Sequence, residues 1–88
     1  MTVVYRRIAD TDQEPFDDEL VVMNAKTEAV VALNGPARVL WEALAEGAPA
    51  AELEALFTAA CPGADSGRDV AEALAALTDA GLVVAAEG

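Results

Sequence analysis

The spacing of the apolar residues changes after Leu33, and this change limits the folds open to the chain. Residues 3–8, 20–23 and 28–33 are rich in valine and other β-branched or aromatic residues, a composition typical of short strands. The apolar residues that follow recur at the i, i+3, i+4, i+7 spacing of amphipathic helices. The sequence therefore predicts three strands followed by three helices.

The second and third of these strands should form a hairpin, because only residues 24–27 separate them. This connection contains no glycine, so we expect one residue to adopt a positive φ at some conformational cost. Residues 9–15 are polar and are predicted to form a loop. Asp17, Asp18 and Glu19 are interpreted as a solvated acidic loop, since charge runs in small domains are usually solubilising.

Proline, glycine and capping residues mark the boundaries of the predicted helices. Ser66, followed three residues later by Asp69, resembles a capping box for the third helix. Leu82 can fold back on the last turn of that helix, and Val83 and Val84 either add a short strand or simply pack. The other boundary residues, in chain order, are Asn34, Gly35, Pro36, Gly47, Pro49, Pro62, Gly63 and Gly81.

A three-stranded antiparallel sheet cannot bury its apolar face alone, so the helices should cover one side of it. The chain has short connections throughout, neither repeats nor a dividing linker, and a length of 88 residues. We therefore expect one domain, residues 1–88, with an α+β fold. Three helices with a small sheet also describe winged helix-turn-helix proteins.

The formal net charge of -11 restricts the partners of the protein. Five basic residues stand against sixteen acidic ones, so DNA, RNA and anionic lipids should be repelled. The predicted third helix carries one arginine, Arg68, where a recognition helix would present several basic or amide side chains. A basic or apolar partner is favoured.

The chemistry of an enzyme is missing from the sequence. The chain has no histidine and a single cysteine, Cys61, so neither a Cys/His nucleophile pair nor a zinc site can be assembled, and we interpret Cys61 as a small buried hydrophobic residue. No calcium-loop or phosphate-loop spacing is present. We expect no catalytic residue, metal or cofactor. No apolar run is long enough to span a bilayer and no signal-like region opens the chain, so a cytoplasmic location is expected.

The strand at residues 28–33 is the strongest candidate for a binding site. If this strand lies at a sheet edge, Ala29, Val30, Val31 and Ala32 offer no charge or proline that would protect it from pairing. An extended peptide could then add as a further strand, flanked by apolar residues of the third helix. The alternative interpretation is that Val30, Val31, Val70, Leu74 and Leu77 are simply core residues, which should hold for about half of them because strand side chains alternate between faces.

The order of these elements resembles the PqqD-like family, the precursor-peptide recognition elements of peptide natural-product biosynthesis. The resemblance is carried by the segment ELVVMNAKTEAVVALNGPARVLWEAL at residues 19–44. Later in the chain it is carried by a series of helix-core positions and a closing Gly-Leu, namely Glu52, Leu53, Leu56, Phe57, Cys61, Pro62, Asp69, Val70, Leu74, Leu77, Gly81, Leu82 and Val83. Glu28 departs from the pattern, because hairpins of this kind often place glycine there.

The resemblance implies a winged helix-turn-helix-like fold that binds a leader peptide as an extra antiparallel strand. It further implies a stand-alone protein of the lasso-peptide type, working with a separate leader peptidase and a cyclase. The pyrroloquinoline quinone pathway chaperone remains an alternative, as does a winged-helix transcriptional regulator. Carried onto this sequence, the expected peptide-binding residues are Glu28, Ala29, Val30, Val31, Ala32, Leu33, Arg68, Asp69, Val70, Glu72, Ala73, Ala76 and Leu77.

Overall fold

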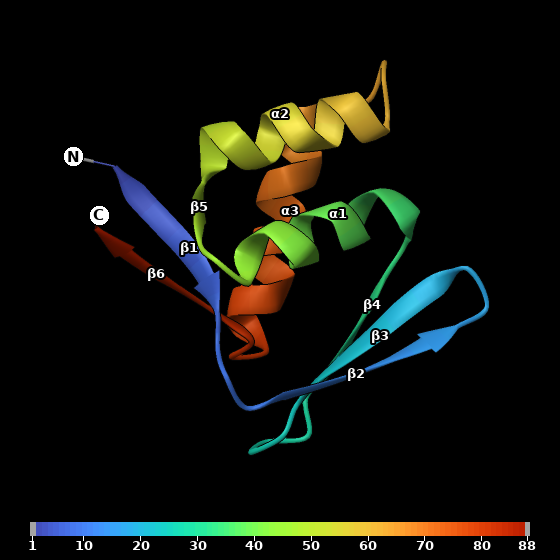
Figure 1. Cartoon of the computed structure of the whole chain (residues 1–88), viewed down its shortest axis with the longest axis vertical. Helices are drawn as coiled ribbons and strands as arrows, with labels where there is room; N and C mark the ends of the chain where they lie inside the picture. Colours follow the sequence, from blue (N-terminus) through green and yellow to red (C-terminus); the bar gives the residue numbers. More distant parts are fainter. Residues whose placement is uncertain (1, 88) are drawn as a thin grey trace.

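The protein has two small antiparallel sheets beside a layer of three helices (Figure 1). The structure is a computed structural model and describes residues 2–87. In chain order the elements are β1 (Val3–Arg7), β2 (Thr11–Phe16), β3 (Glu19–Asn24), β4 (Val30–Leu33), α1 (Gly35–Leu44), β5 (Ala48–Pro49), α2 (Ala50–Ala60), α3 (Ser66–Asp79) and β6 (Val83–Glu87).

The predicted α+β fold with a three-stranded antiparallel sheet and three helices is confirmed, but the sheet contains a different first strand. Strands β2, β3 and β4 form this sheet in that order, whereas β1 lies between β5 and β6 in a second sheet. The chain bends between β1 and β2, at Ala9 and Asp10, so that consecutive strands belong to different sheets (Figure 1). The apolar segment at residues 3–8 thus forms a strand, β1, as predicted. Val83 and Val84 begin β6, which pairs with β1, so they add a strand rather than only packing against the core.

The prediction of a loop over residues 9–15 was wrong. Residues 11–16 form β2, whose side chains are mostly exposed and polar, so no alternating apolar pattern marks the strand. Pro15 fits because it lies at an edge, where proline removes no ladder hydrogen bond. A two-residue turn joins β2 to β3, and Asp17 takes a φ of 55° there without the glycine that usually signals such a turn.

Trp41 of α1 connects the two sheets. Its indole is fully buried, and its Nε1–H donates to Oε1 of Gln13 in β2 at 2.9 Å. The guanidinium of Arg7 in β1 lies 4.8 Å from the centre of the indole ring and donates to the Trp41 carbonyl. One aromatic side chain therefore holds β1 and β2 against the same helix.

The hairpin between β3 and β4 contains the positive φ that its lack of glycine predicts. Glu28 has a φ of 64°, its N–H donates to the carbonyl of Asn24 at 2.7 Å, and the N–H of Asn24 donates to the carbonyl of Ala29 at 2.9 Å. This is the geometry of a bulge whose first residue is normally glycine. The structure thus gives Glu28 the left-handed conformation expected of the residue that stands in place of glycine.

Replacing Glu28 with glycine should stabilise the fold by about 1 kcal/mol, because a left-handed conformation costs a residue with a Cβ roughly that much. Chemical denaturation would show a higher urea midpoint with an unchanged slope. Glu28→Ala is the matched control, since it removes the carboxylate and keeps the Cβ. If alanine stabilises as much as glycine, charge rather than backbone strain is the cause.

The helices begin and end near the predicted capping, proline and glycine residues, with one correction at α3. Asn34 caps α1, because its Oδ1 accepts from the N–H of Ala37 at 3.0 Å. The N-cap of α3 is Asp65, whose carboxylate accepts from the N–H of Arg68, and Ser66 is already helical, so the predicted capping box at Ser66 was wrong. Ser66 instead bonds the hydroxyl of Thr58 in α2 at 2.6 Å.

The C-terminal end of α3 is a Schellman motif. Gly81 has a φ of 73°, its N–H donates to the Thr78 carbonyl, and the N–H of Leu82 donates to the Leu77 carbonyl. The predicted left-handed cap at Gly81 is therefore confirmed. This turn directs the chain from α3 into β6.

The core lies between the helices and the inner faces of the two sheets. All three helices contribute to it, together with alternate residues of β3 and β4, as expected for strands with one buried face. Its members are Leu20, Val22, Leu33, Leu40, Trp41, Leu44, Ala48, Leu53, Phe57, Val70, Leu74, Leu77, Leu82 and Val83.

Candidate functional site

Strand β4 is an open edge of the β2-β3-β4 sheet. Among residues 2–87, β3 is the one strand that pairs with it. The opposite edge, β2, contains Pro15 and the charged residues Asp12 and Glu14, which discourage pairing. The sequence VVAL of β4 carries no such protection. Of the two edges, β4 is the one built to accept another strand.

The alternation of hydrogen bonds in an antiparallel pair decides which groups of β4 face outward. The bond from the N–H of Asn24 to the carbonyl of Ala29 fixes the phase of the ladder. Counting from it, Val31 directs its N–H and C=O toward β3. The N–H and C=O groups of Val30 and Ala32 therefore point away from the sheet and are free to bind an added strand.

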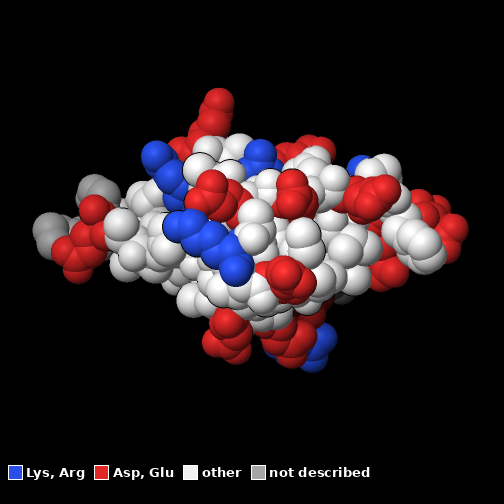
Figure 2. Space-filling model, turned by 90° about the horizontal axis from the view of Figure 1, so that it is seen from below, with Lys and Arg blue, Asp and Glu red and all other residues white. Residues whose placement is uncertain are grey.

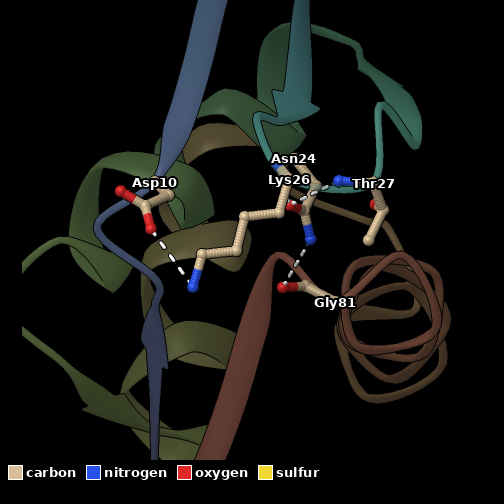
Figure 3. Close-up of polar contacts among 5 residues, drawn as sticks. All are labelled: Asp10, Asn24, Lys26, Thr27 and Gly81. Carbon is tan, nitrogen blue, oxygen red and sulfur yellow. Dashed lines mark hydrogen bonds and ion pairs between the residues drawn. The ribbon is translucent and has the colours of Figure 1, made fainter.

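Helix α3 and the turn that follows it lie near both ends of β4. Before the hairpin turn that leads into β4, the side-chain amide of Asn24, the last residue of β3, donates to the carbonyls of Ala80 and Gly81, both at 3.2 Å, just after the end of α3. Figure 3 shows the bond to Gly81. At the far end of β4, Asn34 and Ala73 line the same hollow. Strand and helix thus run in opposite directions.

A hollow of about 350 Å³ lies where β4 passes into α1. Residues of all three helices form its walls. The lining residues are Asn34, Ala37, Phe57, Asp69, Glu72 and Ala73. It is large enough for one side chain of a segment lying along β4. Its two carboxylates, of which Asp69 already lies 3.5 Å from Arg68, favour a side chain with an apolar stem and a cationic end.

The predicted residues on the strand side divide by their orientation. Glu28 lies in the bulge before β4 and is exposed. Leu33 is buried and Val31 half-buried on the face that packs against the core. Val30 and Ala32 have their side chains on the opposite, exposed face of the sheet. A peptide added to this edge would thus meet the main chain of Val30 and Ala32.

The predicted residues on the helix side also divide. Asp69, Ala73 and Ala76 lie on one flank of α3, at the helical spacing that places them on the side of β4, and Glu72 lies beside them at the hollow. Arg68 is exposed and pairs with Asp69 at 3.5 Å. Of these residues, Asp69, Glu72 and Ala73 line the hollow, and their binding of a peptide stays a prediction.

Val70 and Leu77 were predicted among the binding residues but are each 1% exposed. Their side chains belong to the core, as the alternative interpretation expected. We therefore infer that they hold α3 in position and do not contact a peptide. Sequence reasoning missed Asn34, Ala37 and Phe57, which line the hollow. The sequence pattern indicates a helix cap at Asn34 and core positions at Ala37 and Phe57. No local signal in the sequence shows that the three helices meet at this hollow.

The charges on the surface are mostly acidic. The face seen in Figure 2 shows acidic side chains spread over it, with a small group of basic ones among them. An exposed pair between Lys26 and Asp10, 3.4 Å apart, lies near the hairpin turn (Figure 3). Nothing on this face forms the continuous basic surface that phosphate groups require.

The described part of the chain offers no metal centre and no membrane span. Within residues 2–87, no three His, Cys, Asp or Glu side chains are grouped so that they could hold a metal ion. None of the helices in this range combines the length and apolar character needed to cross a bilayer. Cys61 is a free thiol, partly buried at the end of α2.

Comparison with known families agrees with this geometry. The sequence model of the family described as "Coenzyme PQQ synthesis protein D (PqqD)" matches residues 19–83, from the first residue of β3 to the first residue of β6. The chain belongs to the PqqD family. The expected membership is therefore confirmed, and both the open edge and the hollow lie within the part of this PqqD family member that the match covers.

A solved structure described as "TbiB1 in Complex with the TbiA(beta) Leader Peptide" has the same fold. It is 23% identical to this PqqD family member, with a TM-score of 0.71 over 89% of this chain and 93% of that one. The fold is thus shared over almost the whole length of both proteins. A search of curated proteins finds no match.

Proposed function

We propose that this protein binds the leader segment of a ribosomally synthesised precursor peptide, of the lasso-peptide type, and presents it to a separate leader peptidase and cyclase. The open β4 edge beside α3 carries this proposal, since an extended segment can complete the ladder there by β-strand addition. The leader-bound state of the structural neighbour supports it. The protein would act as a non-catalytic binding partner in the cytoplasm and would need neither cofactor nor metal.

The proposed leader lies antiparallel to β4, along the groove toward the hollow at Asn34 and Phe57. The main chain of Val30 and Ala32 supplies affinity, and the groove side chains supply selectivity. Asp69 and Glu72 favour a leader with a basic side chain at the hollow. The net charge of -11 favours such a leader over an acidic one.

Isothermal titration against the leader of the precursor peptide encoded beside this gene tests the proposal. We expect saturable binding well below about 100 µM. No binding at that concentration would contradict the assignment. The family description favours one alternative, a peptide chaperone of the pyrroloquinoline quinone pathway, which would bind the precursor of that pathway in preference to a lasso leader.

Amide hydrogen exchange gives a second test with its control built into the strand. Without peptide, the outward amides of Val30 and Ala32 should exchange fast and the inward amide of Val31 slowly. The leader should slow exchange at Val30 and Ala32, by about tenfold or more, and change Val31 much less. Equal protection at all three residues would indicate global stabilisation rather than strand addition.

A further inference from the structure

A second groove lies on the opposite flank of α3. A hollow of about 400 Å³ separates this flank from the second sheet. Its surface is mainly apolar, with Val70 and Leu74 as its floor and Tyr5 and Ala85 on the sheet side. Helix positions advance about 100° per residue, which places Ala71, Ala75 and Thr78 of this hollow about 180° around α3 from Asp69, Ala73 and Ala76.

This groove also has an open strand beside it. Strand β6 is an edge of the β5-β1-β6 sheet, and no other strand among residues 2–87 pairs with its outer side. The N–H of Ile8 donates to the carbonyl of Leu82, and alternation from that bond turns the main-chain groups of Ala85 and Glu87 outward. The side chain of Ala85 lines the hollow. Between Val83 and Ala86 the strand carries neither charge nor proline.

The charges at this groove select its occupant. Glu54 and Asp79 line the hollow, and no lysine or arginine of the described chain does. A second copy would bring the same carboxylates and a net charge of -11, so like charges would oppose self-association. A segment with apolar side chains and a lysine or arginine would pair with Glu54 and Asp79 and fill the apolar floor.

We propose that this second groove, formed by β6, Tyr5 and the Ala71–Ala75 flank of α3, docks an extended apolar and basic segment of the leader peptidase. The inference rests on the proposed function, which makes such a peptidase the partner. Because the two grooves occupy opposite flanks of one helix, leader and peptidase would bind together, separated by about one helix diameter of 10–12 Å. Such proximity raises the effective concentration of the leader at the peptidase.

Two neighbouring alanines of α3 test this arrangement. Ala75 lines the second groove and Ala76 lies on the side of β4; both are exposed and helical, so arginine at either position costs the helix little. Binding of the purified leader peptidase and of the leader peptide would be measured separately for each variant. We expect Ala75→Arg to weaken peptidase binding about tenfold or more and leave leader affinity within about twofold. Ala76→Arg should do the reverse.

Peptidase affinity equal to that of the parent in Ala75→Arg would overturn the inference, as would a parent protein that binds leader but no peptidase. A leader that competes for this groove, or a dimer that Ala75→Arg dissociates in sedimentation, would also overturn it by assigning the groove to another occupant. Failure of the proposed function is distinguishable, because the parent protein would then not bind the leader peptide at all.

Discussion

Replacing Ala32 with proline is expected to weaken leader binding at least tenfold while leaving the fold largely intact. The N–H of Ala32 points away from β3, so proline removes a donor that the fold does not use and a leader would need. A net loss of about 1.4 kcal/mol, from the missing bond and the ring at the edge, gives the tenfold change. Isothermal titration with the leader measures it.

Pro15 shows why the sheet should tolerate this substitution. It already lies at the other edge, in β2, at a position whose nitrogen faces outward. Ala32→Ser is the matched control, because serine keeps the N–H and should bind within about twofold of the parent. Val31→Pro should instead unfold the hairpin, since the N–H of Val31 bonds β3. If Ala32→Pro folds and binds like the parent, the leader does not add to β4.

The helices and the second hairpin could be predicted from the sequence because each has a local physical signal. Pro36 and Gly81 limit the helices through their backbone conformations, and the alternation Leu20, Val22 marks a strand with one buried face. Strand β4 remains an edge because α1 follows it directly and the later strands, β5 and β6, both pair with β1.

The elements that could not be predicted depend on contacts distant in the chain. Strand β2 has no apolar alternation, and its position depends on pairing with β3 and on the bond from Gln13 to Trp41. The hollow needs Asn34, Phe57 and Asp69, which come from three segments. Their meeting is set by helix packing, which spacing along one helix does not encode. Sequence reasoning therefore located the edge but not the pocket beside it.

Asn24 fixes the position of the hairpin relative to α3, and its loss should destabilise the protein by about 2–6 kcal/mol. The residue is 4% exposed. Its amide donates to the carbonyls of Ala80 and Gly81, and its Oδ1 accepts from the N–H groups of Lys26 and Thr27. Figure 3 shows Asn24 with Gly81, Lys26 and Thr27. Asn24→Ala removes all four hydrogen bonds and leaves two carbonyls and two N–H groups without this partner. Each lost bond should lower the free energy of unfolding by about 0.5–1.5 kcal/mol.

Lys26 provides the contrast within the same turn. Its pair with Asp10 is exposed on both sides, so Lys26→Ala should change the free energy of unfolding by less than about 1 kcal/mol. Urea denaturation of the two alanine variants would separate the buried polar network from the surface ion pair. Similar losses in both variants would mean that turn conformation, and not the bonds of Asn24 to α3, holds the hairpin in place.

Gly81 allows the same connection to be tested from the side of the helix. A Cβ added there would lie 2.9 Å from Nδ2 of Asn24, and the φ of 73° is unfavourable for alanine, so Gly81→Ala should cost about 1–3 kcal/mol. Asn24→Ala removes the atom that the new Cβ would meet. The double variant should therefore lose clearly less stability than the sum of the two single losses, by about 0.5 kcal/mol or more. Additive losses would show that the two residues do not act as one connection between the hairpin and the end of α3.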